Sequence, residues 1–281
     1  MTTPPVALTI AGSDSGGGAG VQADLKAFAA HRVFGTSALT ALTAQNTTGV
    51  TGVHPVPADF VVLQVEAVLT DLPVAAVKTG MLATAAVVAA VAGLAAGGRL
   101  PGLVVDPVMV ASSGARLLEQ EAERAYVDLL LPHAHVLTPN LLEAQVLLGA
   151  EIRTLAEQQE AARALGALGP RVVVVKGGHA VAGTGGDAVD VVWDGATISE
   201  LRRPRQPGGN DHGTGCTFAA TVAARLAHGD DVGSALQIAK DYVAQAMAGA
   251  ADWALGSGPG PLDHFLWEGA AATAPSPTPW P

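Results

Sequence analysis

Short apolar runs alternate with longer Ala-rich stretches of helical spacing along this chain, and this alternation restricts the fold more than any other feature. The apolar runs are rich in Val, Leu and Ile, and five are clear: 6–12, 75–80, 102–107, 134–139 and 171–178. Continuous apolar strands separated by helices are typical of a parallel sheet that is covered on both faces. The sequence therefore predicts a doubly wound α/β domain, which we place at residues 1–268.

The second half of the chain carries more local signals. In residues 188–201, Asp194 and Gly195 separate two strand-like runs, which predicts a tight hairpin and a small antiparallel edge of the sheet. Thr154 and Glu157 have the spacing of a capping box, which predicts a helix start. Residues 269–281 are rich in Ala, Pro and Thr, a composition typical of a disordered tail.

The composition is that of a globular protein and excludes several other classes. Hydrophobic residues make up 49% of the 281 residues and charged residues 14%, which suffices for a deep core. The longest Ala/Val-rich run, 85–98, is shorter than the roughly 20 apolar residues that cross a bilayer, so we expect no membrane span. The net charge of -10, without a basic stripe, argues against a nucleic-acid partner.

The single cysteine and the first residues bear on location. One cysteine excludes an intramolecular disulfide and a Cys-rich metal site, and it is compatible with a reducing cytosol. The first residues contain neither a basic segment nor an apolar stretch of signal-peptide length. We therefore expect a cytoplasmic protein.

Unusual residues follow each predicted strand, where ligands bind in an open parallel sheet. The segments at these ends are GSDSGGGAG, KTGM, DPVM, TPN and KGGH. Gly, Asp, Asn and Pro dominate ordinary turns, so one such segment alone carries little information. Their recurrence predicts an active site at the carboxyl edge of the sheet.

The segment GTGC, residues 213–216, contains the only cysteine and precedes a run of small helix-forming residues. Gly213 and Gly215 have no Cβ, so backbone N–H groups can face a ligand, and the helix start adds positive partial charge. These features predict an anion hole that stabilises a phosphate during its transfer. At a helix start we expect a lowered pKa for Cys216, whose thiolate would accept a proton from a hydroxyl group. The alternative is that Cys216 is a small buried hydrophobic residue.

Several long segments, in one order, resemble the hydroxymethylpyrimidine/phosphomethylpyrimidine kinases of thiamine biosynthesis, which are ribokinase-like proteins. The segments are IAGSDSGGGAGVQADLKAF, ALTAQNTTGV, VKTGML, DPVMVASSGARLL, LTPNLLEA, VKGGH and GTGC, and the resemblance covers residues 6–265. Two positions depart from the family pattern: Thr79, where Ile is common, and Asp211, where Thr is frequent. Asp211 places a negative charge beside the phosphate loop.

The resemblance implies a ribokinase-like fold and ATP-dependent phosphorylation of 4-amino-5-hydroxymethyl-2-methylpyrimidine and of its monophosphate. It implies that Cys216 is the base and that the backbone of residues 213–216 is the anion hole. Gln45 would read the aminopyrimidine edge, because an amide offers both a donor and an acceptor. The other implied contacts of the ring are Gly12, Ala19, Asp24, Met81 and Val108. The family also suggests a homodimer.

A second group of residues suits the nucleotide. Lys176 ends a strand and offers a point charge for phosphates, so we place it in the catalytic set with Gly213, Thr214, Gly215 and Cys216. Asp106 and Glu143 are hard oxygen donors that suit Mg²⁺. The family pattern places Asn140 near the phosphates of ATP, and Thr214 would touch them as well.

Most of these residues also have a structural role available. Met81 and Val108 could be core residues, Asn140 suits a helix N-cap, and Asp24 could be purely structural or lie at the pocket edge. His179 and His212 could be bystanders, since no pair of His residues has metal spacing.

Two other functions stay open. A pyridoxine/pyridoxal kinase also acts on a hydroxymethyl group of a six-membered nitrogen ring, although Gln45 in TAQNT favours the aminopyrimidine. A binding or regulatory module without turnover is the second, but such a module has no need for Lys176, Asp106, Glu143 and Cys216 together.

Overall fold

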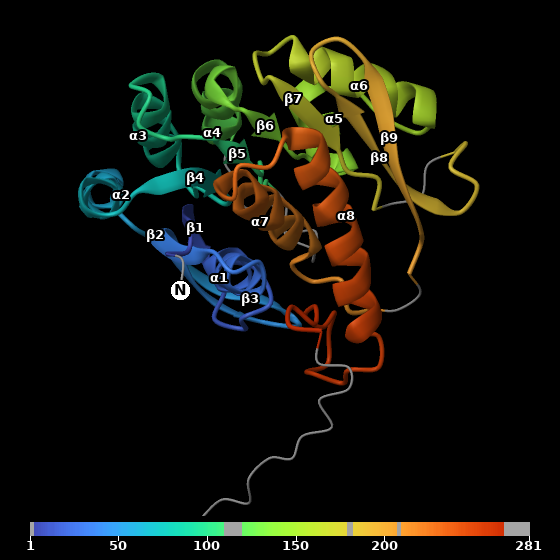
Figure 1. Ribbon diagram of the computed structural model, residues 1–281, viewed down its shortest axis with the longest axis horizontal. Coiled ribbons are helices and arrows are strands. Elements are labelled where there is room, and N and C mark those ends of the chain that lie inside the picture. Colours follow the sequence, from blue (N-terminus) through green and yellow to red (C-terminus); the bar gives the residue numbers. More distant parts are fainter. Residues whose placement is uncertain (1–2, 110–119, 179–181, 207–208, 267–281) are drawn as a thin grey trace, which may run out of the picture.

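A nine-stranded sheet organises the described part of the chain, with the strand order β3-β2-β1-β4-β5-β6-β7-β8-β9 (Figure 1). This computed structural model describes residues 3–109, 120–178, 182–206 and 209–266. The strands are β1 (Val6–Ser13), β2 (Phe34–Asn46), β3 (Gly49–Pro55), β4 (Val74–Thr79), β5 (Val104–Val105), β6 (Val136–Leu137), β7 (Val172–Val175), β8 (Asp187–Trp193) and β9 (Ile198–Pro204). The six strands from β2 to β7 in this order pair in parallel.

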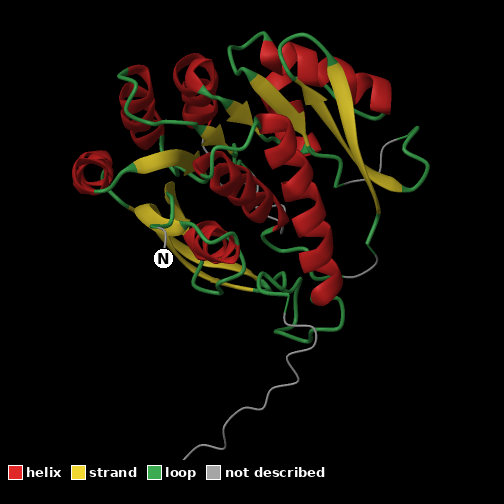
Figure 2. Cartoon of the chain, viewed as in Figure 1, coloured by secondary structure: helices red, strands yellow, loops and turns green. Residues whose placement is uncertain are grey.

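Eight α-helices of the described residues cover both faces of the sheet (Figure 2). They are α1 (Gly20–Ala30), α2 (Ala58–Asp71), α3 (Ala85–Ala96), α4 (Gln120–Ala125), α5 (Leu141–Leu148), α6 (Leu155–Gly166), α7 (Thr214–Ala227) and α8 (Val232–Gly249). A π-helical turn (Tyr126–Leu130) and a 3-10 turn (Leu131–His133) follow α4. Helices α1, α7 and α8 share one buried core, and α2 to α6 share the other. The predicted doubly wound α/β architecture is confirmed.

The pleat of β1 shows how one apolar strand serves two cores. Leu8 and Ile10 are buried in the core under α2 to α6, whereas Ala7 is buried in the core under α1, α7 and α8. Successive side chains of a strand point to opposite faces, so a strand that is covered on both sides is apolar throughout. This is why the five apolar runs identified β1, β4, β5, β6 and β7.

The predicted antiparallel edge is confirmed, and a second one was missed. Strand β8 pairs antiparallel with both β7 and β9, and a four-residue turn at 194–197 joins β8 to β9. At the opposite edge, β3 pairs antiparallel with β2. These two strands gave no apolar run, because β3 is an exposed edge and β2 is rich in Thr, Ser and Ala.

Helix starts are set by local side chains. The predicted capping box of Thr154 and Glu157 is present at the start of α6. Asn140 and Glu143 form a second capping box at the start of α5, so the structural role considered for Asn140 is present. Within the described residues, no helix is both long and apolar enough to span a bilayer. The expected tail at 269–281, the expected domain end at 268 and His179 lie outside the described residues.

Candidate functional site

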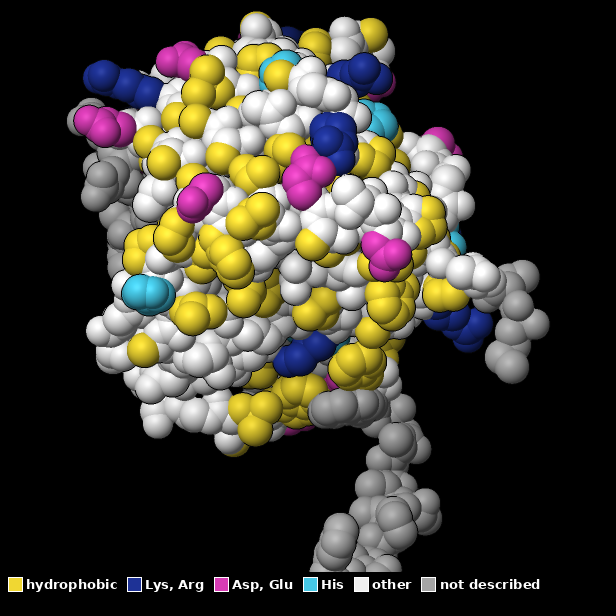
Figure 3. Space-filling view, turned by 90° about the vertical axis from the view of Figure 1, so that its left-hand side faces the viewer, with side chains coloured by type: hydrophobic (Ala, Val, Ile, Leu, Met, Phe, Trp, Pro, Cys, Tyr) yellow, Lys and Arg dark blue, Asp and Glu magenta, His cyan; other side chains and the backbone are white. Residues whose placement is uncertain are grey.

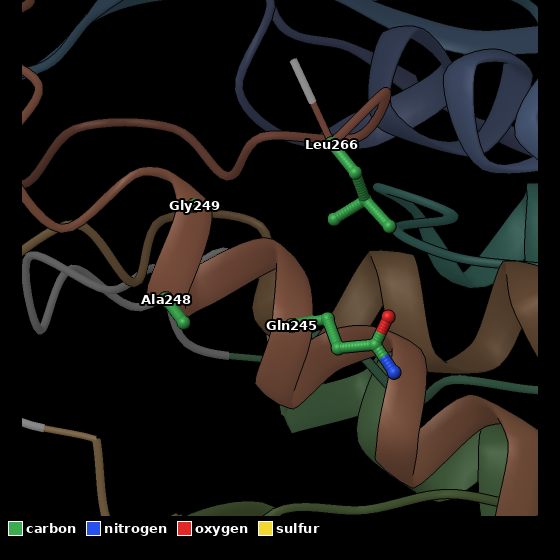
Figure 4. Close-up of a pocket in the computed structure, with 4 residues that line it drawn as sticks. All are labelled: Gln245, Ala248, Gly249 and Leu266. Carbon is green, nitrogen blue, oxygen red and sulfur yellow. The ribbon is translucent and has the colours of Figure 1, made fainter. Parts of the chain in front are cut away.

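A cavity of about 660 Å³ lies at the carboxyl ends of the parallel strands, where the sequence predicted the site. The segments that follow β1, β4, β5, β6 and β7 all contribute to its walls. Of the residues that the sequence singled out, those lining the cavity are Gly12, Ala19, Gln45, Met81, Asp106, Val108, Asn140, Glu143, Lys176, Asp211, His212, Gly213, Thr214, Gly215 and Cys216. A smaller hollow of about 200 Å³ lies beside the end of α8, between Gln245, Ala248, Gly249 and Leu266, and among the described residues no ionisable side chain lines it (Figure 4).

The start of α7 has the geometry of an anion hole. Gly213 is the N-cap of α7 and has a φ of 88°, in the left-handed region that favours glycine. A Cβ at this position would also clash with the carbonyl oxygen of Gly18, so the turn requires glycine twice over. The first turn of an α-helix leaves its N–H groups without intrahelical acceptors, and these groups attract anions.

Three ionisable side chains meet opposite this helix start. Lys176 Nζ donates to Asp106 Oδ1 at 2.8 Å, and a Cβ at Gly215 would lie 3.0 Å from Lys176 Nζ. Burial raises the pKa of Glu143 to about 7, even though the positive charge of Lys176 acts to lower it. Burial would lower the pKa of Lys176, but the charges of Asp106 and Glu143 raise it, so this lysine stays protonated.

The two carboxylates fit a magnesium site of the kind that nucleotides complete. Asp106 and Glu143 are both nearly fully buried and both line the cavity. Magnesium usually takes one or two carboxylates, and phosphate oxygens and water supply the rest of its octahedron. No group of three or more His, Cys, Asp or Glu suited to a metal is found among the described residues, so a metal cage made by the protein alone is not present there.

The other end of the cavity is formed by the segments after β1 and β4 and by the end of β2. A Cβ at Gly12 would clash with Met81 Cε, so the end of the Met81 side chain packs directly on the backbone of β1 and would have to move if Gly12 carried a side chain. Thr40 Oγ1 donates to the carbonyl of Met81 at 2.6 Å, which fixes the segment after β4. Ala19 and Val108 complete this end, and Gln45 brings an amide to it from the end of β2.

The implied contact of Asp24 with the ring has to be corrected, because Asp24 does not line the cavity. Its side chain is fully buried below the cavity wall, where Lys78 Nζ donates to both carboxylate oxygens at 2.9 Å. Thr9 Oγ1 also donates to Asp24 at 2.6 Å. Lys78 itself lines the cavity, so Asp24 acts on the site by holding this lysine and by its charge, which adds to the rise in the pKa of Cys216. One feature of the sequence pointed to Lys78: it lies at the end of an apolar run, as Lys176 does.

Cys216 lies in the first turn of α7 and lines the cavity, as predicted, but its thiol is less acidic than expected. The residue as a whole keeps partial exposure, but its thiol is desolvated by burial. This burial raises the pKa of the Cys216 thiol to about 11, although the charge of Lys78 acts in the opposite direction. The expectation of a lowered pKa is therefore wrong, because desolvation outweighs the helix start.

Sequence reasoning missed the end of the cavity between α8 and the β8–β9 hairpin. The residues that line it are Ala188, Asp190, Arg203, Pro204, Arg205, Gln206, Lys240, Val243, Ala244 and Met247. Lys240 Nζ lies 2.8 Å from Asp190 Oδ2, and Asp190 Oδ1 accepts from Gly177 N–H at 2.8 Å. This pair fixes the turn after Lys176. No sequence motif predicts this end of the cavity, because its residues come from three separate elements.

Cys216 allows a direct test of its acidity, since it is the only cysteine. With a pKa of about 11, the thiolate fraction rises about tenfold per pH unit between pH 7 and pH 9. We expect the rate of alkylation by iodoacetamide to rise in the same proportion, as measured by mass spectrometry. A rate that is already level above pH 7 would mean that the thiolate is present at neutral pH. Cys216→Ala provides the unlabelled control.

Comparison with known proteins agrees with this site. The sequence model of the family described as phosphomethylpyrimidine kinase matches residues 14–263. A hydroxymethylpyrimidine/phosphomethylpyrimidine kinase of Synechococcus elongatus is 49% identical over 93% of this chain and 97% of its own length. The chain spans about half the length of some bifunctional relatives, such as a thiamine biosynthesis protein of Geobacter sulfurreducens, of which it covers 52% at 49% identity.

Solved structures with the same fold belong to two kinds of kinase. A pyridoxal kinase of Bacillus subtilis, solved as an ADP complex, has a TM-score of 0.85 and 37% identity, over 95% of this chain and 99% of that one. A phosphomethylpyrimidine kinase of Clostridium difficile has a TM-score of 0.76 and 36% identity, over 86% of this chain and 99% of that one. The chain therefore has the expected ribokinase-like fold, which these two kinds of kinase share.

Proposed function

The chain belongs to the phosphomethylpyrimidine kinase family, and we propose that it phosphorylates 4-amino-5-hydroxymethyl-2-methylpyrimidine and then its monophosphate, with ATP as donor, in thiamine biosynthesis. One observation carries the proposal: a single cavity joins an amide-bearing pocket, a helix start and a cationic region. The sheet order separates the two ends, since α7 packs on β1, β4 and β5, which lie between β2 and the β8–β9 edge.

The pyrimidine binds at the end formed by Gly12, Ala19, Met81 and Val108. Gln45 supplies the hydrogen-bonding groups that an aminopyrimidine edge requires. Its hydroxymethyl group then faces residues 213–216, where the N–H groups of α7 hold the phosphoryl oxygens. Donors that are fixed before the reaction stabilise the charge that spreads over those oxygens.

ATP binds with its phosphates near Lys176, Asn140 and Thr214 and with its base toward the missed end of the cavity. Val243, Ala244 and Met247 of α8 offer an apolar wall there, and Arg205 offers a positive charge. Asp106 and Glu143 would hold Mg²⁺, which supplies charge neutralisation at the phosphates when it is bound. Lys176, which stays protonated, stabilises negative charge on the transferred group.

In the small fraction of molecules that carry a Cys216 thiolate, the sulfur accepts the proton of the hydroxymethyl group late in the transfer; where Cys216 is a thiol, the proton passes to an oxygen of the transferred phosphate or to water. The high pKa of Cys216 means that little thiolate exists at neutral pH, so early deprotonation contributes little. Phosphoryl transfer passes through a loose transition state, in which the attacking hydroxyl keeps its proton for most of the reaction. The anion hole therefore contributes more to the rate than the base does.

The activity is tested by ADP release from Mg-ATP with hydroxymethylpyrimidine, with its monophosphate and with pyridoxal. We expect turnover with the first two substrates, because Gln45 suits the aminopyrimidine edge. Turnover with pyridoxal alone would assign the chain to the second candidate function. That candidate is favoured by the fold shared with pyridoxal kinase of Bacillus subtilis. Release of ADP from none of the three would favour a binding role.

The relative weight of base and anion hole is tested with two variants. We expect Cys216→Ala to keep measurable activity, because the anion hole and the charges remain. Gly215→Val should lose nearly all activity, since its side chain would enter the space beside Lys176 Nζ and block the phosphate. Steady-state kcat for both variants, with circular dichroism to check folding, decides between them. Equal losses would contradict this order of contributions.

A homodimer is the assembly that we propose, and an apolar surface supports it. The side chains Phe34, Leu42, Val53, Phe60 and Leu63 of β2, β3 and α2 are each 46–62% exposed. Figure 3 views the molecule from the side where α2 lies in Figure 1, and it shows many apolar side chains and few charged ones. Exposed apolar patches of this kind mark protein interfaces. We also propose a cytoplasmic location, in which the free thiol of Cys216 stays reduced.

The dimer is tested by sedimentation of the wild type and of the double variant Phe60→Asp, Leu63→Asp. Two buried charges in an apolar interface are costly, so we expect a dimer for the wild type and a monomer for the variant. Leu255→Asp, at an exposed leucine outside these elements, should leave the mass unchanged. A monomeric wild type at micromolar concentration would contradict the proposal.

A further inference from the structure

The loop after β1 is closed by one carboxylate that also reaches across the cavity. Asp14 Oδ1 accepts from Gly16 N–H at 2.8 Å, and Asp14 Oδ2 accepts from Gly18 N–H at 3.1 Å and Ala19 N–H at 2.9 Å. His212 Nε2 lies 2.9 Å from the same Oδ2. A residue directly before the anion hole is thereby tied to the loop that forms the pyrimidine end.

The hydrogen on His212 can be assigned from this contact. Burial acts against ionisation of Asp14, but the hydrogen bonds from His212 and from the backbone outweigh it and lower the pKa of Asp14. An ionised carboxylate only accepts hydrogen bonds, so His212 Nε2 carries a hydrogen and donates it to Asp14. His212 is therefore not the bystander that the sequence left open.

The amide of Gln45 lies between His212 and Thr43, with its nitrogen toward His212 and its oxygen toward Thr43. His212 suits an acceptor and Thr43 suits a donor, so each faces the wrong end of the amide. Gln45 Nε2 lies 3.4 Å from His212 Nε2, which places two donors face to face. Gln45 Oε1 lies 3.2 Å from Thr43 Oγ1, yet Thr43 already donates its single hydrogen to the carbonyl of Ser13 at 2.8 Å. Thr43 can thus only accept from Gln45. A half-turn of the amide replaces the donor–donor contact by an acceptor that shares the His212 Nε2–H with Asp14, and it lets Gln45 donate to Thr43 Oγ1.

We propose that His212, held by Asp14, is a positioning residue that sets the direction of the Gln45 amide. The amide oxygen lies on the side of His212, and the amide NH₂ group lies on the side of Thr43. The order of acceptor and donor along the pocket wall is then fixed before substrate binds. This inference rests on the proposed function, since it specifies how the same pocket reads its pyrimidine.

The fixed amide also orients the substrate. In the aminopyrimidine, the ring nitrogen N3, the 4-amino group and the 5-hydroxymethyl group follow one another around the ring. The 4-amino group donates to the amide oxygen on the side of His212, and N3 accepts from the amide NH₂ group on the side of Thr43. The next substituent in this order is the hydroxymethyl group, which points beyond His212 toward residues 213–216.

The test uses a substrate with the reversed edge, 5-hydroxymethyl-2-methylpyrimidin-4(3H)-one, which has an acceptor at C4 and an N–H donor at N3. The readouts are the ratio of dissociation constants for the two pyrimidines, by calorimetry, and the ratio of their kcat/KM values. We expect the wild type to prefer the amino compound by about 100-fold, because the reversed edge leaves two buried polar groups mispaired. In His212→Ala the preference should fall to about 10-fold or less.

The control variant is His212→Gln, whose amide nitrogen can replace Nε2 as donor to Asp14. We expect it to restore the preference to within about threefold of the wild type. Loss of affinity for both pyrimidines by the same factor in His212→Ala, with the ratio unchanged, would overturn the proposal and leave a purely structural role. If His212→Ala fails to fold, Thr43→Val removes the other neighbour of the amide and is expected to lower the ratio as well.

This experiment separates the inference from the proposed function. The dissociation constants need no turnover, so the ratio can be measured even if the wild type fails to release ADP with either pyrimidine. Absence of turnover would refute the proposed activity. A wild type that binds both pyrimidines equally would refute the fixed direction of the amide, whatever its activity.

Discussion

The fully buried ion pair of Lys78 with Asp24 joins the sheet to helix α1 behind the site. It connects the end of β4 to α1, and Thr9 of β1 adds a third hydrogen-bonding partner. Removal of one partner from such a pair leaves an uncompensated charge, which costs about 3–5 kcal/mol. The same lysine lies in the cavity wall near Cys216 and opposes the effect of burial on its thiol. One interaction thus serves both the fold and the electrostatics of the site.

The fold was largely predictable because its strands are covered on both faces. Burial on two sides forces a strand such as β7, with four valines, to be apolar throughout, and that signal is local. Strand β3 gave no signal, because it is an exposed edge whose pairing depends on β2. The glycine turn at the start of α7 was equally predictable, since the turn at Gly213 imposes a backbone angle that glycine favours.

The parts of the site that were missed depend on contacts between distant elements. Asp24 and Lys78 are separated by 54 positions, and only the folded chain shows that the carboxylate lies behind the lysine. His212 and Asp14 are separated by 198 positions. The acidity of Cys216 was misjudged for a related reason, because a helix start is visible in a sequence whereas the atoms that desolvate a sulfur are not. Chemistry-bearing residues were therefore easier to find than their electrostatic surroundings.

The raised pKa of Cys216 has a consequence for the durability of the protein. Peroxides and disulfides react with thiolates, and a thiol that stays protonated at neutral pH reacts slowly with both. A cysteine with a low pKa in the same position would be converted to a sulfenic acid during oxidative stress, and the site would then lose its free thiol. Burial of the sulfur leaves little thiolate at neutral pH and thereby protects the residue from oxidation.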